Sequence, residues 1–180
     1  MEALHLYGDA DWVHHTRAFV AVAGVVSGTP IADELEGLYA ALLSWVPVPA
    51  CPPGDMGAIK SLTRQTRMAW LASHILPVSV KYFSLAAYPA TSSINPLLAP
   101  FYDHLSQINR HNDGQILIED AILPRSHLLG YVNADHWAIA LPFNRSTKPA
   151  AALLAVNNAF PREVLLRAVL AHVDEVLQAR

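Results

Sequence analysis

The stretch from His127 to Leu141, HLLGYVNADHWAIAL, constrains the fold more than any other part of the chain. Residues 127–132 are mostly apolar and include aromatic and β-branched side chains, which is typical of a strand buried between two layers. Residues 133–135 then favour a turn, and His136 follows directly. In open α/β sheets, catalytic groups gather beyond the carboxyl ends of the strands. The stretch therefore predicts a buried strand with an exposed His136 at its functional end.

Two further apolar runs predict strands, at residues 16–26 and 78–87. Neither alternates with polar residues, which favours parallel strands covered on both faces. Helical spacing of apolar residues predicts helices at 31–46, 56–76, 97–108 and 160–178, after a short helix at 1–7. Residues 115–123 allow no firm assignment. Alternation of strands and helices indicates a parallel sheet with helices packed on it, so we expect one α/β domain over residues 1–180.

The segment between the first two strands is longer than a simple crossover needs. Residues 46–55, VPVPACPPGD, hold four prolines and a glycine, a density that excludes a regular element. Helical patterns lie on both sides of this proline-rich stretch. We therefore predict that residues of about 31–77 form a helical cap inserted into the domain.

The last predicted helix has the clearest pattern. Pro161 suits its first turn. Its apolar stripe consists of Val164, Leu165, Val169, His172, Val173, Val176 and Leu177. This stripe predicts a helix that packs lengthwise on the sheet.

Composition excludes several classes of protein. A hydrophobic content of 53% with 15% charged residues indicates a packed core. The net charge is −3 and the Lys and Arg residues are scattered, so the sequence shows no basic patch that would bind nucleic acid. No apolar run reaches the roughly 18 residues of a membrane span. The start, MEALHLYGDADW, lacks the features of a signal peptide. We therefore expect a cytoplasmic protein.

A second polar turn lies upstream, in HNDGQI at residues 111–116. Asn-Asp-Gly is a common turn sequence, and Asp113 taken alone is best explained as a turn residue. Its position changes this interpretation, because Asp113 precedes His136 by 23 residues and both follow predicted strands. A carboxylate on the far side of an imidazole fixes its tautomer and stabilises the imidazolium.

Taken together, these pieces resemble the C-terminal half of an α/β-hydrolase of the serine esterase and lipase type. The resemblance rests on RAFVAVAGVV followed by SGTPIADEL, the cap in the position of a lid, VKYFSLAAY leading to HNDGQI, and HLLGYVNADHWAIALP with its terminal helix. The family places its triad in the order Ser, Asp, His. The resemblance implies that Asp113 is the triad acid and His136 the general base. It also implies a small-molecule ester as substrate and no cofactor.

The sequence departs from the family in one respect: it contains no G-x-S-x-G nucleophile elbow. We therefore expect the C-terminal part of a longer serine hydrolase, inactive alone, whose nucleophile and oxyanion hole lie outside this chain. The alternative is a non-catalytic, hydrolase-derived module that associates with a partner or with itself through an exposed sheet edge. The sequence leaves open whether the parent is an esterase, lipase, thioesterase or C–C hydrolase.

Ser27 is the nucleophile candidate within the chain. It follows a predicted strand and precedes a helix, but Val25 and Thr29 occupy positions where a sharp elbow needs small residues. We interpret Ser27 as a turn residue beside Gly28, which takes the unusual dihedral angles.

The remaining polar candidates have structural explanations. Asp135 cannot easily reach the ring of its own neighbour, so we interpret it as a loop or helix-start residue. His14, His15 and His111 lack the spacing and the carboxylate of a metal site and are explained as solvated loop histidines. Cys51 lies among prolines without a nearby base, so no metal site and no thiol nucleophile is predicted.

Overall fold

A computed structural model describes residues 1–34, 55, 57–142 and 154–179. Its centre is a parallel sheet in the order β1-β2-β3, formed by β1 (Ala18–Val22), β2 (Lys81–Ala87) and β3 (His127–Val132). Val20 pairs with Phe83, and Phe83 pairs with His127, so the three strands start at a common edge. The predicted parallel sheet is confirmed. The bounds of β3 match the prediction, and β1 and β2 are shorter than predicted.

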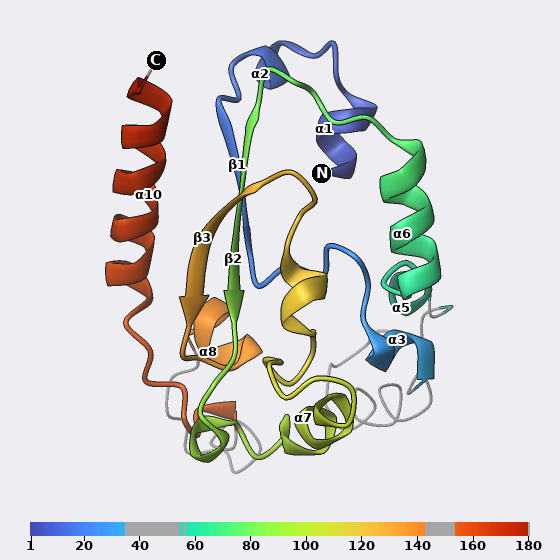
Figure 1. Ribbon diagram of the computed structural model, residues 1–180, viewed down its shortest axis with the longest axis vertical. Helices are drawn as coiled ribbons and strands as arrows, with labels where there is room; N and C mark the ends of the chain where they lie inside the picture. Colours follow the sequence, from blue (N-terminus) through green and yellow to red (C-terminus); the bar gives the residue numbers. More distant parts are fainter. Residues whose placement is uncertain (35–54, 56, 143–153, 180) are drawn as a thin grey trace, which may run out of the picture.

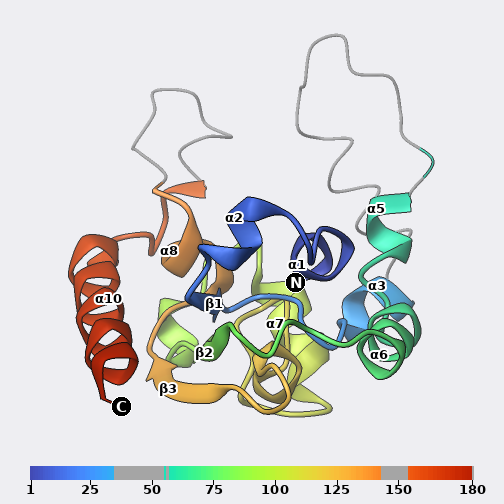
Figure 2. The same cartoon turned by 90° about the horizontal axis from the view of Figure 1, so that it is seen from above.

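Helices lie on both sides of the sheet and beyond its carboxyl end (Figure 1). They are α1 (Glu2–Leu6), α2 (Asp11–His14), α3 (Pro30–Glu34), α5 (Gly57–Lys60), α6 (Arg64–Ser73), α7 (Ala99–Ser106), α8 (His136–Ala140) and α10 (Arg162–Gln178), with 3-10 turns η1 (Thr91–Ser93) and η2 (Ile118–Ala121). Seen from above, α10 and α6 lie at opposite sides of the molecule (Figure 2). The mixed α/β architecture agrees with the predicted class.

Each face of the sheet has its own apolar core. On one face, Phe83 and Leu85 of β2 pack with Val169 and Val173 of α10 and with Ile139 of α8. On the other face, Ala21, Val26 and Leu123 pack with Leu71 and Leu76, and Ala86 packs with Ile116 and Ala121. A separate cluster of Ile31, Leu98, Phe101, Leu105 and Leu117 joins α3 and α7. The middle strand is therefore buried on both faces.

The prediction that the strand at 127–132 is buried is wrong. Leu128 is 44% exposed and Tyr131 51% exposed, whereas Leu129 and Val132 pack into the core beneath α10. In the described part of the chain β3 pairs with β2 alone, so it forms an edge of the sheet. An apolar run alone does not distinguish an edge strand from a central one.

The apolar stripe predicted for the last helix is only partly correct. Val169 and Val173 are buried, and Leu165, Val176 and Leu177 pack against the same core. Val164 is 66% exposed, and the side chain of His172 is also exposed. The face that packs on the sheet is therefore narrower than the predicted stripe.

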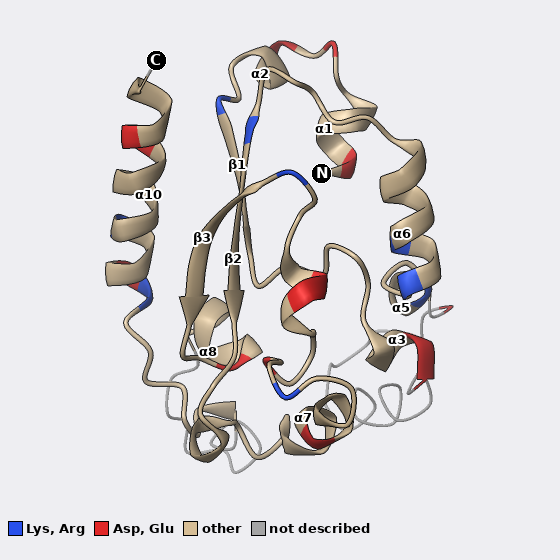
Figure 3. Cartoon of the chain, in the orientation of Figure 1, with Lys and Arg blue, Asp and Glu red and all other residues tan. Residues whose placement is uncertain are grey.

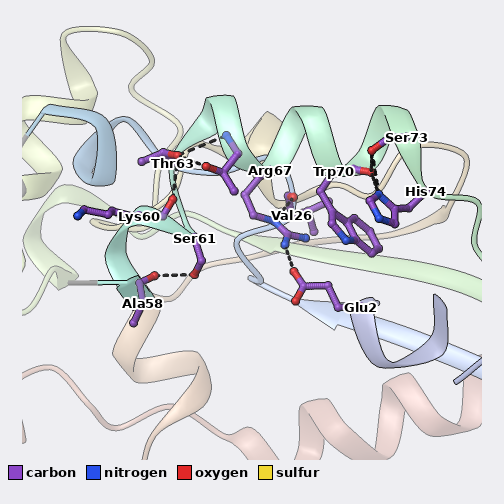
Figure 4. Close-up of polar contacts among 11 residues, drawn as sticks. Glu2, Val26, Ala58, Lys60, Ser61, Thr63, Arg67, Trp70, Ser73 and His74 are labelled. Carbon is purple, nitrogen blue, oxygen red and sulfur yellow. Dashed lines mark hydrogen bonds and ion pairs between the residues drawn. The ribbon is translucent and has the colours of Figure 1, made fainter. Parts of the chain in front are cut away.

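The helix predicted at 56–76 is broken into α5 and α6. Thr63 adopts an extended conformation between them, and its hydroxyl accepts a hydrogen bond from the Thr66 amide, which caps α6 (Figure 4). The nearly buried Arg67 then anchors α6. Its Nε donates to the Val26 carbonyl oxygen at 3.2 Å, its Nη1 pairs with Glu2, and its guanidinium lies 5.2 Å from the Trp70 ring centre.

The predicted cap is only partly within the described residues. Residues 35–54 and 56 lie outside them, so the predicted helix at 31–46 is described only in its first turn, α3. At the other end, Leu71 of α6 packs against Ala21 of the sheet, as a crossover helix does. The cap stays a prediction for the remainder. No helix among the described residues is long and apolar enough to cross a membrane.

Candidate active site

Asp113 lies in a tight turn beyond the carboxyl end of β2. Gly114, next in the chain, has a φ of +89°, a conformation that glycine adopts without strain. Asp113 is 1% exposed, and its Oδ1 accepts hydrogen bonds from the amides of Gln115 at 2.9 Å and Ile116 at 2.8 Å. The turn therefore holds one carboxylate oxygen in place and leaves the other, Oδ2, for a different partner.

That partner is His136, the first residue of α8. Its Nδ1 lies 2.8 Å from Asp113 Oδ2, and its backbone amide donates to the Asp113 carbonyl oxygen at 2.9 Å. The structure thus brings together the two residues that the sequence proposed as a pair. Trp137, the next residue, packs against the cluster that joins α3 and α7.

The surroundings of His136 favour its protonated form. Burial alone lowers its pKa, but the charge of Asp113, the hydrogen bond to that carboxylate and the charge of Asp135 together outweigh burial, so the pKa lies above its ordinary value. When the ring is neutral, a proton on Nδ1 faces Asp113 and Nε2 carries the free lone pair. Nε2 makes no hydrogen bond to any described residue, and 21% of the side chain is exposed. The ring can therefore accept a proton at Nε2.

Asp135 positions the helix that carries His136. Its Oδ1 accepts from the Ala138 amide at 2.7 Å as the N-cap of α8, and its Oδ2 accepts from the Asn95 amide at 2.8 Å. Burial raises the pKa of Asp135 despite these bonds. The interpretation of Asp135 as a helix-start residue is confirmed.

Asn95 is a buried residue that sequence reasoning missed. Its side chain donates to the Val156 carbonyl oxygen at 2.8 Å and to that of Leu154 at 3.2 Å. With the bond from its amide to Asp135, Asn95 connects the loop after β2 to α8 and to the segment before α10. The dipeptide Asn-Pro at 95–96 is a turn signal that could have marked it.

Ser27 occupies the turn that the sequence predicted. Its amide donates to the Asp120 carbonyl oxygen at 3.0 Å, and Gly28 has a φ of +94°. No hydrogen bond joins its hydroxyl to His136 in the described structure. The structure therefore does not bring Ser27 into the pair.

His14, His15 and His111 are exposed, and the described residues contain no group of three metal-ligating side chains. Cys51 lies outside the described residues.

The fold is similar to that of solved ester-cleaving enzymes, although no protein-family model and no curated protein matches the chain. The crystal structure of a metagenomic carboxyl esterase superposes on 97% of the chain with a TM-score of 0.86 and 40% sequence identity. The chain has the fold of a partial α/β-hydrolase. The chain spans about half of that esterase, 52% of its length.

Two lipases share the fold at lower identity. The mature lipase of Bacillus licheniformis matches 92% of the present chain with a TM-score of 0.59 and 20% identity, and the chain covers 59% of that lipase. The lipase of Staphylococcus hyicus matches 90% of the present chain with a TM-score of 0.60 and 10% identity, and the chain covers 57% of that lipase. At these identities the likeness concerns the fold alone, and the fold is that of a partial α/β-hydrolase.

Proposed function

We propose that this chain supplies the acid–base pair of a serine hydrolase that cleaves carboxylic esters or related acyl bonds. The observation that carries the proposal is the 2.8 Å contact between His136 Nδ1 and the buried carboxylate of Asp113, at the carboxyl end of the strands. The 40% identity to a carboxyl esterase supports the substrate class. No cofactor is needed, because acyl transfer by a triad uses only side chains and backbone amides.

In the proposed reaction, His136 acts as general base and then as general acid. Nε2 takes the proton of a serine hydroxyl as its oxygen attacks the ester carbonyl, and the ring then returns that proton to the leaving alcohol. A water molecule, activated by the same nitrogen, cleaves the acyl-enzyme. Asp113 stabilises the transient imidazolium, and the amides of Gln115 and Ile116 keep its carboxylate oriented throughout.

The nucleophile and the oxyanion hole belong, in this proposal, to residues outside the chain. The sequence has no G-x-S-x-G elbow, and Ser27 lies in a different turn. The purified 180-residue chain should therefore not hydrolyse p-nitrophenyl butyrate above background. Turnover that disappears in Ser27→Ala would contradict the proposal and make Ser27 the nucleophile.

The DNA upstream of the Met1 codon provides an independent test. The proposal predicts an in-frame strand followed by G-x-S-x-G. In-frame stop codons directly upstream, with no such element, would favour the alternative function.

That alternative is a non-catalytic module that associates through the open edge of β1. Within the described residues β1 pairs with β2 alone, and Val22 at its end is 41% exposed. Nearby, Leu166 and Leu170 of α10 are 58% and 57% exposed. A stable self-associated species in light scattering, from a gene without an upstream elbow, would favour this function over catalysis.

A further inference from the structure

A hollow of about 360 Å³ lies at the amino-terminal ends of the strands. Its lining runs from Leu71 and His74 through Ile75–Val78 to Val80, Lys81 and Tyr82, and is completed by Leu123–Arg125 and His127. Lys81 and His127 are the first residues of β2 and β3, whereas Asp113 and His136 lie beyond the other ends. Since β2 has seven residues, about 20 Å of strand separates the hollow from the Asp113–His136 pair.

The floor of the hollow is apolar. Leu71, Leu76 and Tyr82 are partly buried in the core behind it, and Val80 and Leu123 are almost fully buried. At its margin the apolar surface continues into solvent, because Ile75 is 83% exposed and Val78 is 96% exposed. Large apolar side chains exposed to this degree beside a concave apolar surface are typical of a ligand-binding groove.

The charged residues of the hollow all carry the same sign. Lys81 and Arg125 line it together with two histidines, and no Asp or Glu is among the lining residues. Figure 3 shows positive residues at the start of β2 and in the loop before β3. Neither Lys81 nor Arg125 forms an ion pair with a described residue. Both cations therefore remain available to an anion from solution.

The conformation of Arg125 is unusual as well. Its φ of 64° lies in the left-handed region, which arginine rarely adopts. This turn separates Leu123, in the floor of the hollow, from His127 at the start of β3. The residue with this left-handed backbone conformation, Arg125, is therefore one of the two cations that line the hollow.

We propose that this hollow binds a free, single-chain carboxylate of the fatty-acid class. The alkyl chain lies on the apolar floor between Leu71, Leu76 and Leu123, and the carboxylate pairs with Lys81 and Arg125. A fatty acid combines the two properties that the lining requires, one terminal negative charge and a flexible apolar tail. The site is separate from the Asp113–His136 pair, so it does not depend on the proposed hydrolase activity.

Titration calorimetry of the purified 180-residue chain at pH 8 tests this site with octanoate, decanoate and decanol. Burial of one CH₂ strengthens binding about fourfold. Decanoate has two more CH₂ groups than octanoate, so it should bind on the order of tenfold more tightly. Decanol, which has the same tail without the charge, should bind at least about tenfold more weakly than decanoate. Amide chemical shifts should change at residues 71–82 and 123–127 and not at Asp113 or His136.

Matched variants separate charge from fold. The double variant Lys81→Gln/Arg125→Asn removes both charges, and Asn tolerates the positive φ at position 125. It should weaken decanoate binding about tenfold or more, whereas Lys60→Gln, a change of another exposed lysine outside the lining, should leave it unchanged. Circular dichroism of both variants checks that they fold.

Several outcomes would overturn the proposal. They are the absence of saturable decanoate binding to the folded wild-type chain, equal affinity in the double variant, and shift changes confined to the Asp113–His136 pair. Binding to phosphatidylglycerol vesicles without binding of monomeric decanoate would instead assign the hollow to a membrane surface.

Discussion

Replacing Asp113 with Asn should lower the pKa of His136. In the wild-type chain the Asp113 carboxylate, 2.8 Å from Nδ1, is the main influence that raises this pKa, and burial of the ring opposes it. Asn keeps the shape and can accept the Nδ1 hydrogen bond, but it removes the negative charge. In Asp113→Asn, burial of the His136 ring lowers its pKa, and the charge of Asp135 is left to oppose this decrease.

The size of the change follows from the geometry. An opposite charge within about 4–6 Å typically shifts a pKa by about 1–3 units. Asp113 is 1% exposed, so solvent screens its charge poorly, and we expect the pKa of His136 in Asp113→Asn to fall below its wild-type value. One pKa unit corresponds to about 1.4 kcal/mol.

The same pair links stability to pH. Because folding raises the pKa of His136, the ion pair stabilises the folded chain fully below the unfolded value of about 6.5. This contribution is lost as pH rises through the folded pKa. The difference in unfolding free energy between wild type and Asp113→Asn should therefore be larger at pH 6 than at pH 9.

Proton–nitrogen NMR of the imidazole measures the pKa directly, and urea unfolding at the two pH values measures the stability difference. His172→Gln serves as the control, because this exposed histidine lies on α10 away from the site. An unchanged His136 pKa in Asp113→Asn, with the fold intact, would refute the coupling on which the candidate site rests.

Two substitutions test the structure around the site. Asp135→Ala leaves the buried amides of Asn95 and Ala138 without their acceptor, so it should lower the unfolding free energy, measured in urea, by about 2–5 kcal/mol. Asp135→Asn should recover part of this free energy. A decrease below about 1 kcal/mol in Asp135→Ala would contradict the assigned role. Gly28→Ala should cost at least about 2 kcal/mol, because φ is +94° and a Cβ would lie 2.4 Å from the backbone of α6. Gly8→Ala is the control for Gly28→Ala, because a Cβ at position 8 would make only ordinary van der Waals contacts. Equal melting temperatures for Gly28→Ala and Gly8→Ala would be inconsistent with the packing described.

The proximity of Asp113 and His136 could be predicted from the sequence because both residues follow strands of one parallel sheet. Apolar runs identified all three strands, and parallel strands bring their carboxyl ends to one edge, so Asp113 and His136 meet although 23 residues separate them. The turn chemistry of Asn-Asp-Gly and the helix-start role of Asp135 are local properties, which sequence patterns record directly.

Other features depend on which surfaces meet in the folded chain. The exposure of Leu128 and Tyr131 follows from the edge position of β3, which an apolar run does not reveal. The 3-10 turn at Ile118–Ala121 lies in a segment that allowed no assignment, since its acidic and apolar residues alternate without a clear period. The role of Asn95 depends on carbonyl groups about 60 residues away along the chain.

The central claim is that the imidazole of His136, paired with Asp113, moves protons for a serine outside this chain. The most direct measurement is the kcat for p-nitrophenyl butyrate of the longer polypeptide read in frame from upstream of Met1, with and without His136→Ala. The account predicts a loss of about a thousandfold or more in kcat with little change in KM. A folded His136→Ala protein that retains kcat within about tenfold of the wild type would contradict it.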